Sequence, residues 1–349
     1  MDEAIRADEL CKTYRVKVRD SGLAGALRAL VRPRYRDVRA LDRVSFGVAP
    51  GEIVAFLGPN GAGKTTALKI LAGLLHPTSG RARVAGFEPW QGGPPFKRRI
   101  AIVLGNKQQL LWDLPAEETF LLNRAIYDVS MADYRERLDN LIDLLVLGEV
   151  IDKPVRQLSL GERMKCELVA ALLHRPDILF LDEPTLGLDV AAQDTIRTFL
   201  KAYRDRYGAT VLLTSHYMAD VTALAQRVLI INRGRLLYDG ELSALVARHA
   251  RNKRLHLVLG DGVTAADLER FGDVREFAFP HATLEVAREE APRVSAALLS
   301  AVSVVDLSIQ DPPIEEVIRR AFEVGDDGGA AGDQDDAGAT RIRDGASAP

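Results

Sequence analysis

Nine consecutive residues carry the clearest chemistry in this chain. They read Gly-Pro-Asn-Gly-Ala-Gly-Lys-Thr-Thr and have the spacing of a phosphate-binding loop. Glycines lack a Cβ, so the backbone can turn successive N–H groups toward one point and surround phosphate oxygens. Lys64 adds a full positive charge, and Thr65 offers a hydroxyl to a Mg²⁺ ion that bridges two phosphates. We therefore predict that a nucleoside triphosphate and Mg²⁺ bind at this loop. Its residues are Gly58, Pro59, Asn60, Gly61, Ala62, Gly63, Lys64, Thr65 and Thr66.

Two elements must position this loop. The apolar run 53–57 before it predicts a buried strand, and the apolar residues from Ala67 to Leu74 after it recur with helical spacing. Because the predicted helix begins at the loop, its positive end adds to the attraction for phosphate. Kinases, GTPases, helicases and transport ATPases all use such a unit, so the loop alone does not decide among them.

An acidic pair follows a second predicted strand. Residues 178–181 form a continuous apolar run, typical of a buried parallel strand, and the run ends in Asp182 and Glu183. Acidic groups at the carboxyl end of such a strand face the ligand crevice of a doubly wound sheet. We expect Asp182 to contact Mg²⁺, directly or at one remove. We expect Glu183 to orient and deprotonate the attacking water.

The segment from Ser159 to Glu162 opens a predicted helix over residues 163–174. Ser159 and Glu162 have the spacing of a capping box, so one interpretation is a well-capped helix. The other interpretation is a helix N-terminus that presents its positive end to the phosphates of a second nucleotide. The spacing leaves both interpretations open.

The order of these motifs resembles that of the ATP-binding subunits of ABC transporters. Their Leu-Ser-Gly-Gly-Gln signature corresponds to Leu158–Glu162, with Leu160 in place of Gly and Glu162 in place of Gln. The resemblance extends over about residues 5–240 and implies ATP as the nucleotide. It also implies an α/β fold, in which a P-loop ATPase core with a mostly parallel central sheet carries an antiparallel β subdomain and a helical subdomain. The series is completed by Gly187, Leu188, Asp189, Thr214, Ser215 and His216.

The same resemblance implies a head-to-tail dimer, expected to be a homodimer. In it, the signature of one copy covers the triphosphate that the other copy holds. The Ser159 hydroxyl and the Gly161 N–H, in one turn with Leu160 and Glu162, would complete the cage around the terminal phosphate. ATP binding would close this dimer and hydrolysis would open it, which provides a cycle that a partner can use.

Three further residues take roles from the resemblance, and each has a structural alternative. His216, at a predicted strand end, is assigned to the terminal phosphate, although a His there can be purely structural. Asp189 is assigned to the subunit interface, and it can also cap the predicted helix 190–207. Tyr14 is assigned to stacking on adenine, or else it only packs at a strand end.

The segment 100–115 resembles that of an ABC-2-type exporter subgroup, which includes multidrug and daunorubicin-resistance ATPases. The subgroup has a Gly-Gln pair followed by Gln-Leu-Trp-Trp-Asp-Leu-Pro. The family's glutamine, which touches Mg²⁺ and couples to the transmembrane partner, corresponds to Asn106 or passes to Gln109. Loop amides are also common without any ligand, so a purely structural interpretation stands beside these.

Residues 19–39 form an unusual insertion. Leu23, Leu27 and Leu30 follow helical spacing, and arginines from Arg28 to Arg39 concentrate positive charge around them. One interpretation is a basic amphipathic segment that lies against anionic lipid or a membrane partner. The other is a solvated helix packed on its own domain.

Composition agrees with a subunit that works at the cytoplasmic face of a membrane without crossing it. The 349 residues hold no apolar stretch near the roughly 20 residues that a membrane span requires, and no leader at Met1. Lys plus Arg number 46 against 49 Asp plus Glu, a net charge of −3, so nucleic acid is not an expected partner. Cys11 and Cys166 are too few for a disulfide framework.

The chain is expected to hold one large and one small domain. Residues 1–240 would form the nucleotide-binding domain, with a helical subdomain at about 100–170 and a closing hairpin at 227–239. Residues 241–324 would form a small α/β domain, ferredoxin-like in pattern, and the Gly, Ala and Asp rich residues 325–349 a disordered tail. In the small domain the predicted strands lie near 255–259, 277–279 and 304–309, and the predicted helices at 291–299 and 312–322.

The predicted function is ATP hydrolysis that powers export by a separate ABC-2-type permease, with Glu183, His216 and Lys64 as catalytic residues. The alternatives are an importer subunit, a soluble ABC ATPase acting on ribosomes or DNA, and a kinase. Soluble relatives usually join two such domains or insert long coiled coils, and a kinase would leave the signature and the acidic pair unexplained. The transported compound contacts the permease, so this sequence does not identify it.

Overall fold

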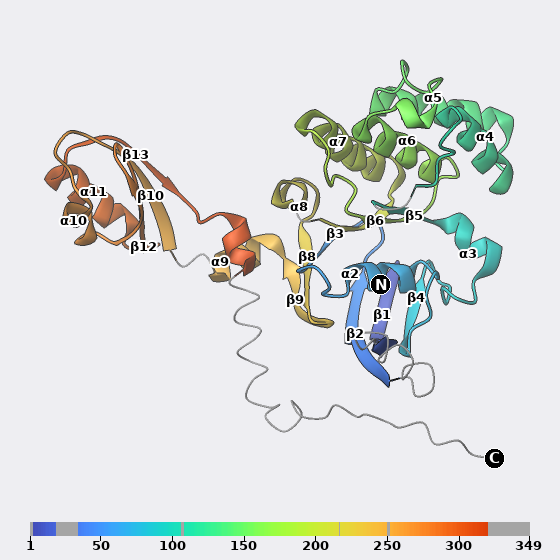
Figure 1. Ribbon diagram of the computed structural model, residues 1–349, viewed down its shortest axis with the longest axis horizontal. Coiled ribbons are helices and arrows are strands. Elements are labelled where there is room, and N and C mark those ends of the chain that lie inside the picture. The colour runs from blue at the N-terminus through green and yellow to red at the C-terminus, as the bar shows by residue number, and fades with distance from the viewer. Residues whose placement is uncertain (1–2, 19–33, 106–107, 216, 250–251, 320–349) are drawn as a thin grey trace, which may run out of the picture. The chain divides into compact units, whose positions relative to one another are not determined.

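The computed structural model describes residues 3–18, 34–105, 108–215, 217–249 and 252–319 (Figure 1). The chain forms two compact units that divide between Gly240 and Glu241, and each is described by itself. The calls on Asn106, His216, residues 19–33 and the tail lie outside the described residues.

The larger unit is built on a six-stranded sheet with strand order β5-β6-β7-β3-β8-β9. Four neighbouring pairs run parallel: β5 with β6, β6 with β7, β7 with β3, and β3 with β8. Every residue of β3, β6 and β7 is buried, as expected for central parallel strands built from continuous apolar runs. The strands are β3 (Ile53–Leu57), β5 (Ile100–Leu104), β6 (Ile178–Asp182), β7 (Thr210–Thr214), β8 (Arg227–Asn232) and β9 (Arg235–Glu241).

A three-stranded antiparallel sheet, in the order β2-β1-β4, packs over helix α2 (Lys64–Leu71). This helix lies between the two sheets, and its buried Leu68 and Leu71 belong to a hydrophobic core that includes residues of both (Figure 1). The helix ends earlier than its apolar pattern suggested, because Gly73 adopts a left-handed conformation, and Leu74 is exposed beyond it. The strands are β1 (Ile5–Val18), β2 (Arg34–Val48) and β4 (Ser79–Val84).

Strand β2 corrects the predicted insertion. Its first residues, Arg34 to Val38, pair with β1 in a regular antiparallel ladder in which Val38 lies opposite Tyr14 and Tyr35 opposite Lys17. Backbone pairing, with Arg15 packed over the Tyr35 ring, makes this stretch a strand rather than part of a basic helix.

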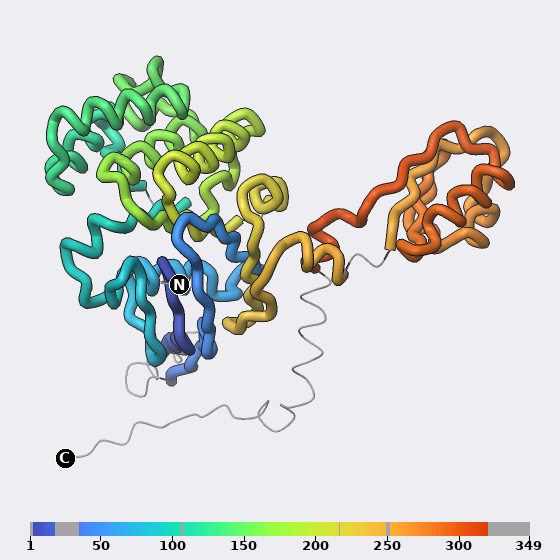
Figure 2. Tube along the Cα trace, turned by 180° about the vertical axis from the view of Figure 1, so that it is seen from behind, coloured from blue at the N-terminus to red at the C-terminus, as the bar shows by residue number. Residues whose placement is uncertain are grey.

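Helices cover the other face of the six-stranded sheet (Figures 1 and 2). The helical region begins later than residue 100, because residues 100–104 are strand β5, which pairs with β6 inside the sheet. Helix α7 has the predicted bounds, since Asp189 caps its first turn and left-handed Gly208 follows its last residue. Besides α2, the helices of the larger unit are α3 (Gly93–Arg99), whose buried Phe96 packs in the same core as α2, and α4 (Ala116–Ile126), α5 (Met131–Leu145), α6 (Leu160–Leu172), α7 (Val190–Tyr207) and α8 (Met218–Leu224).

The smaller unit is an antiparallel sheet in the order β11-β12-β10-β13 with two helices in the connections. The alternation of strands and helices with this order is the split βαβ arrangement of ferredoxin-like folds. Leu255, Leu257 and Leu284 face the helices and form its core with Leu298. The elements are α9 (Leu242–His249), β10 (Asn252–Leu259), α10 (Ala265–Glu269), β11 (Asp273–Ala278), β12 (His281–Ala287), α11 (Ala291–Ala301), β13 (Val304–Gln310) and a helical stretch over 314–319.

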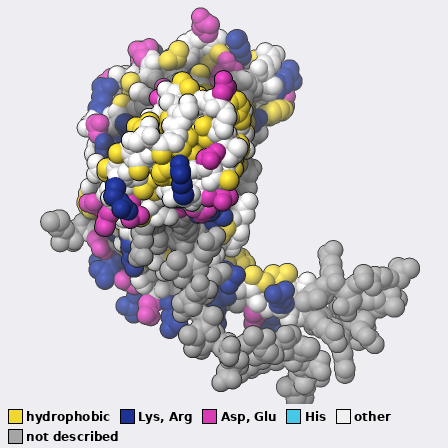
Figure 3. Space-filling view, turned by 90° about the vertical axis from the view of Figure 1, so that its left-hand side faces the viewer, with side chains coloured by type: hydrophobic (Ala, Val, Ile, Leu, Met, Phe, Trp, Pro, Cys, Tyr) yellow, Lys and Arg dark blue, Asp and Glu magenta, His cyan; other side chains and the backbone are white. Residues whose placement is uncertain are grey.

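Charged side chains of both signs are interspersed with hydrophobic ones on the face that Figure 3 shows. None of the helices in the described ranges combines the length and the apolar character that a membrane crossing needs.

His174 joins the helical region to the sheet. Its ring stacks on Tyr127 with the centroids 3.8 Å apart, and its Nε2 lies 3.1 Å from the carbonyl oxygen of Ile100. Burial lowers the pKa of His174 from 6.5 to about 4, so the folded protein keeps this ring neutral.

We expect His174 to make the protein sensitive to acid. A base with a lowered pKa stabilises the fold above its unfolded pKa of 6.5, and this stability is lost as the pH falls toward about 4. The shift corresponds to about 3 kcal/mol of unfolding free energy. Denaturant titrations at pH 7 and pH 4 should show His174→Gln losing less stability on acidification than the wild type by about this amount. An exposed control, His281→Gln, should lose as much as the wild type, and equal losses in all three proteins would contradict the assignment.

Candidate functional site

The strand order brings the predicted site residues to one edge of the larger sheet. In parallel strands the carboxyl ends lie together, and β6, β7 and β3 are neighbours. The loop from Gly58 follows β3, Asp182 ends β6, and Thr214 ends β7. Segments more than a hundred residues apart in the sequence therefore meet at one place.

The phosphate loop closes around its own lysine. Lys64 is almost fully buried, and its ammonium donates to the carbonyl oxygens of Gly58 at 2.5 Å and Pro59 at 3.2 Å. Gly63 precedes α2 with a φ of 112°, and a Cβ there would lie 2.4 Å from the carbonyl oxygen of Ala40, so only glycine fits. Burial lowers the pKa of Lys64, while the nearby carboxylates of Glu183 and Asp182 oppose this shift.

Hydroxyl groups converge on Asp182. The Thr65 hydroxyl donates to Asp182 Oδ2 at 2.9 Å, and the Thr214 hydroxyl donates to Oδ1 at 2.8 Å. The Thr65 oxygen keeps its lone pairs while its proton is engaged, so a hydroxyl and a carboxylate oxygen lie together at the start of α2. Two such oxygens are the ligand types that Mg²⁺ prefers, and the donor set fits this ion.

Glu183 leaves the strand direction directly after Asp182. Its φ is 55°, in the left-handed region, which costs a non-glycine residue on the order of 1 kcal/mol. Thr214 holds this backbone, because the Glu183 N–H lies 3.0 Å from the Thr214 hydroxyl oxygen and 3.2 Å from its carbonyl oxygen. The Glu183 carboxylate lies near enough to Lys64 to affect the pKa of the lysine.

The signature segment forms the N-terminus of α6. Ser159 caps the helix: its hydroxyl accepts the Glu162 N–H at 3.2 Å, and the Glu162 carboxylate accepts the Ser159 N–H at 2.8 Å. The capping-box interpretation is therefore confirmed. These hydrogen bonds lower the pKa of Glu162, so the turn carries a negative charge at neutral pH. Leu160 is exposed, and Gly161 is buried in the same turn.

The remaining predicted site residues have separate places. Tyr14 is 37% exposed on β1, with the Lys12 ammonium 5.4 Å from its ring centre. Asp189 accepts the Ala192 N–H at 2.9 Å, so its capping role is confirmed. The Gln109 side-chain amide nitrogen donates to the carbonyl oxygen of Ile102, so this amide group already has a hydrogen-bond partner within the fold.

Two supports of the site were not assigned from the sequence: Thr214 was named in the motif series without a role, and Asp220 was missed. Thr214 bonds both acidic residues, and its position at the end of the β7 apolar run could have indicated this role. Asp220 is fully buried and accepts hydrogen bonds from Arg197 at 2.6 Å, from Ser215 at 2.8 Å and from the Thr185 hydroxyl. This network joins the residues after β6 and β7 to α7, and no local spacing indicates it.

The larger sheet is doubly wound and mostly parallel, and the phosphate loop follows its strand β3. Two carboxylates lie at the end of β6, which is separated from β3 by β7. This combination defines a P-loop nucleoside triphosphatase. Residues 41–186 match the ABC transporter family, and residues 251–310 match the C-terminal domain of EvrA-like ABC transporters.

Curated relatives and a solved structure agree with this family. The chain is 35% identical over 236 residues to the daunorubicin/doxorubicin resistance ATP-binding protein DrrA of Streptomyces peucetius, covering 68% of this chain and 71% of the relative. It is 34% identical over 216 residues to the ABC transporter ATP-binding protein NatA of Bacillus subtilis, covering 61% and 87%. A solved ATP-binding subunit of an ABC transporter is similar with a TM-score of 0.58 and 27% identity, covering 70% of this chain and 92% of that one.

The chain belongs to the family of ABC transporter ATP-binding subunits. It is an ATPase, and its nucleotide is ATP. The predicted fold class and family are confirmed.

Proposed function

We propose that this chain powers export through a separate ABC-2-type membrane permease, by closing a dimer on ATP and opening it after hydrolysis. The observation that carries the hydrolytic part is the group formed by Lys64, Thr65, Asp182 and Glu183 at the strand ends. Glu183 takes a proton from the water that attacks the terminal phosphate. Lys64 leaves the loop carbonyls for the phosphate oxygens, and its charge offsets the charge that develops there.

Thr65 and Asp182 would hold Mg²⁺ with the nucleotide. The ion supplies a positive charge that polarises the terminal phosphate. Thr214 keeps Asp182 oriented, since its hydroxyl occupies the other carboxylate oxygen. His216, at the terminal phosphate, and Tyr14, by stacking on adenine, complete the proposed set.

The cage around the terminal phosphate is proposed to come from a second copy. Helix α2, which begins at the phosphate loop, and helix α6, which begins at the signature, lie on opposite faces of the six-stranded sheet (Figure 1). The positive ends of both helices can therefore serve one triphosphate if Ser159 and Gly161 approach from another subunit. Asp189 caps α7 within one copy and is proposed to lie at the same interface.

Export is favoured over import by the relatives. The chain is 35% identical to a daunorubicin/doxorubicin resistance protein and 36% identical to a Nod factor export ATP-binding protein of Burkholderia thailandensis, of which it covers 70%. Import is the second candidate, because the cobalt import ATP-binding protein CbiO of Rhodobacter capsulatus is 34% identical, with 77% of its length covered. In either case the subunit would be peripheral, on the cytoplasmic face of the membrane.

Direction can be tested in the native cell. A strain without this chain should accumulate an exported compound inside the cell, and the wild-type gene should restore its release while the Glu183→Gln gene should not. Intracellular and extracellular metabolites would be compared by mass spectrometry. Loss of uptake of an external compound, with no compound retained inside, would overturn export in favour of import. Purification of a tagged chain from detergent extracts should also recover a protein with several apolar spans.

A further inference from the structure

Glu167 is a buried carboxylate in the middle of α6, one of the few buried charged side chains among the described residues. Only 4% of its surface is exposed. Its Oε1 accepts the N–H of Gln109 at 2.8 Å and that of Leu110 at 3.4 Å, in the segment that follows β5. Its Oε2 has no hydrogen-bond partner in the described part of the chain. Burial raises the pKa of Glu167, because desolvation disfavours the charged carboxylate. A carboxyl group at this cost in the interior calls for an explanation.

The segment 109–114 is held by the helical region at several points. The Leu111 N–H donates to the Thr119 hydroxyl on α4 at 3.1 Å, next to the two N–H groups that Glu167 accepts. The carbonyl oxygens of Trp112 and Leu114 accept the N–H groups of Arg156 and Val155. Segment 109–114 is therefore hydrogen-bonded to the helical region at several points, and Glu167 attaches it to α6, the helix that carries the signature.

The other end of this connection lies against the acidic pair. Gly105 donates its N–H to the carbonyl oxygen of Asp182 at 2.9 Å. A Cβ on Gly105 would lie 2.9 Å from that oxygen and 3.0 Å from the carbonyl oxygen of Glu183, so the backbones are in close contact. Only three residues thus separate Gly105, which packs on the catalytic strand end, from Gln109, which is bonded to α6.

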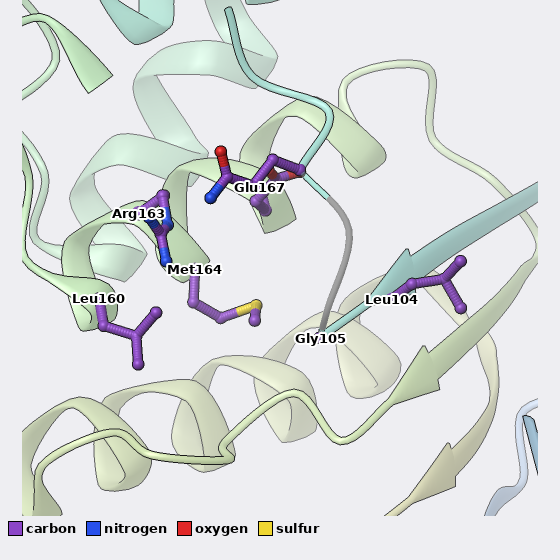
Figure 4. Close-up of a pocket in the computed structure, with 7 residues that line it drawn as sticks. Leu104, Gly105, Leu160, Arg163, Met164 and Glu167 are labelled. Carbon is purple, nitrogen blue, oxygen red and sulfur yellow. The ribbon is translucent and has the colours of Figure 1, made fainter. Parts of the chain in front are cut away.

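A pocket of about 240 Å³ lies between the two ends of the connection. It is lined by Leu104, Gly105 and Gln108 on one side and by residues of α6 on the other, among them Met164 and Glu167 (Figure 4). Space at this place leaves room for Gly105 and α6 to change their separation. In a close-packed interior such a movement needs a gap, because side chains cannot be compressed.

We propose that Glu167 is a positioning residue, which transmits a movement at Asp182 and Glu183 to the signature turn at the N-terminus of α6. The inference rests on the proposed function, because the signature must act on the ATP of a second copy. Glu167 fixes the backbone of Gln109 and Leu110 to α6, so a displacement of this segment turns the helix and moves Ser159 with it. Chains of hydrogen bonds and rigid helices carry such coupling.

The test compares Glu167→Ala with Glu167→Gln in the full-length chain. The amide of glutamine keeps one oxygen for both N–H groups, so Glu167→Gln should retain the wild-type kcat. Glu167→Ala removes the acceptor and should lower kcat on the order of tenfold to a hundredfold, with a nearly unchanged Kd for ATP. Glu167→Met fills a similar volume without an oxygen and replaces Glu167→Ala if that variant does not fold. Thr119→Ala is the matched control, since it frees the neighbouring N–H from α4 and should lower Tm with little effect on kcat.

A double-mutant cycle with Ser159→Ala separates the possible failures. If Glu167 acts through the signature, the kcat losses of Glu167→Ala and Ser159→Ala should fall short of multiplying in the double variant. Multiplying losses, or a Glu167→Ala effect on Tm alone, would overturn the positioning role. A Ser159→Ala variant with full activity would overturn the proposed function instead, whatever Glu167→Ala does.

Discussion

Glu183→Gln should reduce ATP hydrolysis by about a hundredfold to ten-thousandfold, the range for removal of a general base. The amide cannot take the proton of the attacking water, while Lys64, Thr65 and Asp182 still hold the nucleotide. ATP should therefore bind with an unchanged Kd and remain intact, and the variant should accumulate as a nucleotide-bound dimer. Phosphate release in steady state would measure the loss, and size-exclusion chromatography with ATP would detect the dimer.

The matched control for this variant is Glu149→Gln, an exposed position in the helical region. It makes the same chemical change away from the sheet edge and should hydrolyse ATP at the wild-type rate. Glu183→Gln with full turnover would show that another group takes the proton. A loss of ATP binding would show instead that Glu183 acts on the loop.

Ser159→Arg should lower ATP hydrolysis on the order of a hundredfold, the cost of removing a preorganised donor from a developing charge. The arginine side chain would be too large to fit between the signature turn of one copy and the nucleotide of the other. The substitution also removes the hydroxyl that caps α6. ATP should still bind each monomer, because the phosphate loop is untouched. Hydrolysis at saturating ATP and binding of a fluorescent ATP analogue measure the two properties separately.

Loss of a helix cap alone costs on the order of 1 kcal/mol, so this effect needs its own control. Ser130 caps α5 in the same manner, with its hydroxyl accepting the Asp133 N–H at 3.1 Å. Ser130→Arg should reproduce the stability loss of Ser159→Arg while retaining ATPase activity. Equal activity losses in the two variants would trace the effect to helix stability rather than to the signature.

Local patterns predicted much of the site, because its motifs follow directly on the elements that position them. The apolar runs before Gly58 and before Asp182 are buried parallel strands, and the spacing of Ser159 and Glu162 is a capping box. Parallel strands place their carboxyl ends at one edge of the sheet. Once the strands were identified, the phosphate loop and the acidic pair were therefore expected to lie close together.

Long-range pairing explains what local patterns left out. Residues 34–38 became strand because they pair with β1, and residues 100–104 became strand because they pair with β6. Glu167 lies inside an apolar helical run, where its position alone suggests an exposed face. Its partners are N–H groups nearly sixty residues earlier, which only the folded chain brings to it.

A mixing experiment tests most directly whether each ATP pocket needs two copies. Lys64→Ala lacks the phosphate-binding charge, and Ser159→Arg lacks the signature, so each variant alone should be nearly inactive. In a mixed dimer, the loop of the Ser159→Arg copy meets the intact signature of the Lys64→Ala copy. Random pairing of equal amounts should therefore restore roughly a quarter of the wild-type ATPase rate per chain, because half of the dimers hold one intact pocket. A co-expressed mixture no more active than its two components would contradict a pocket shared between copies.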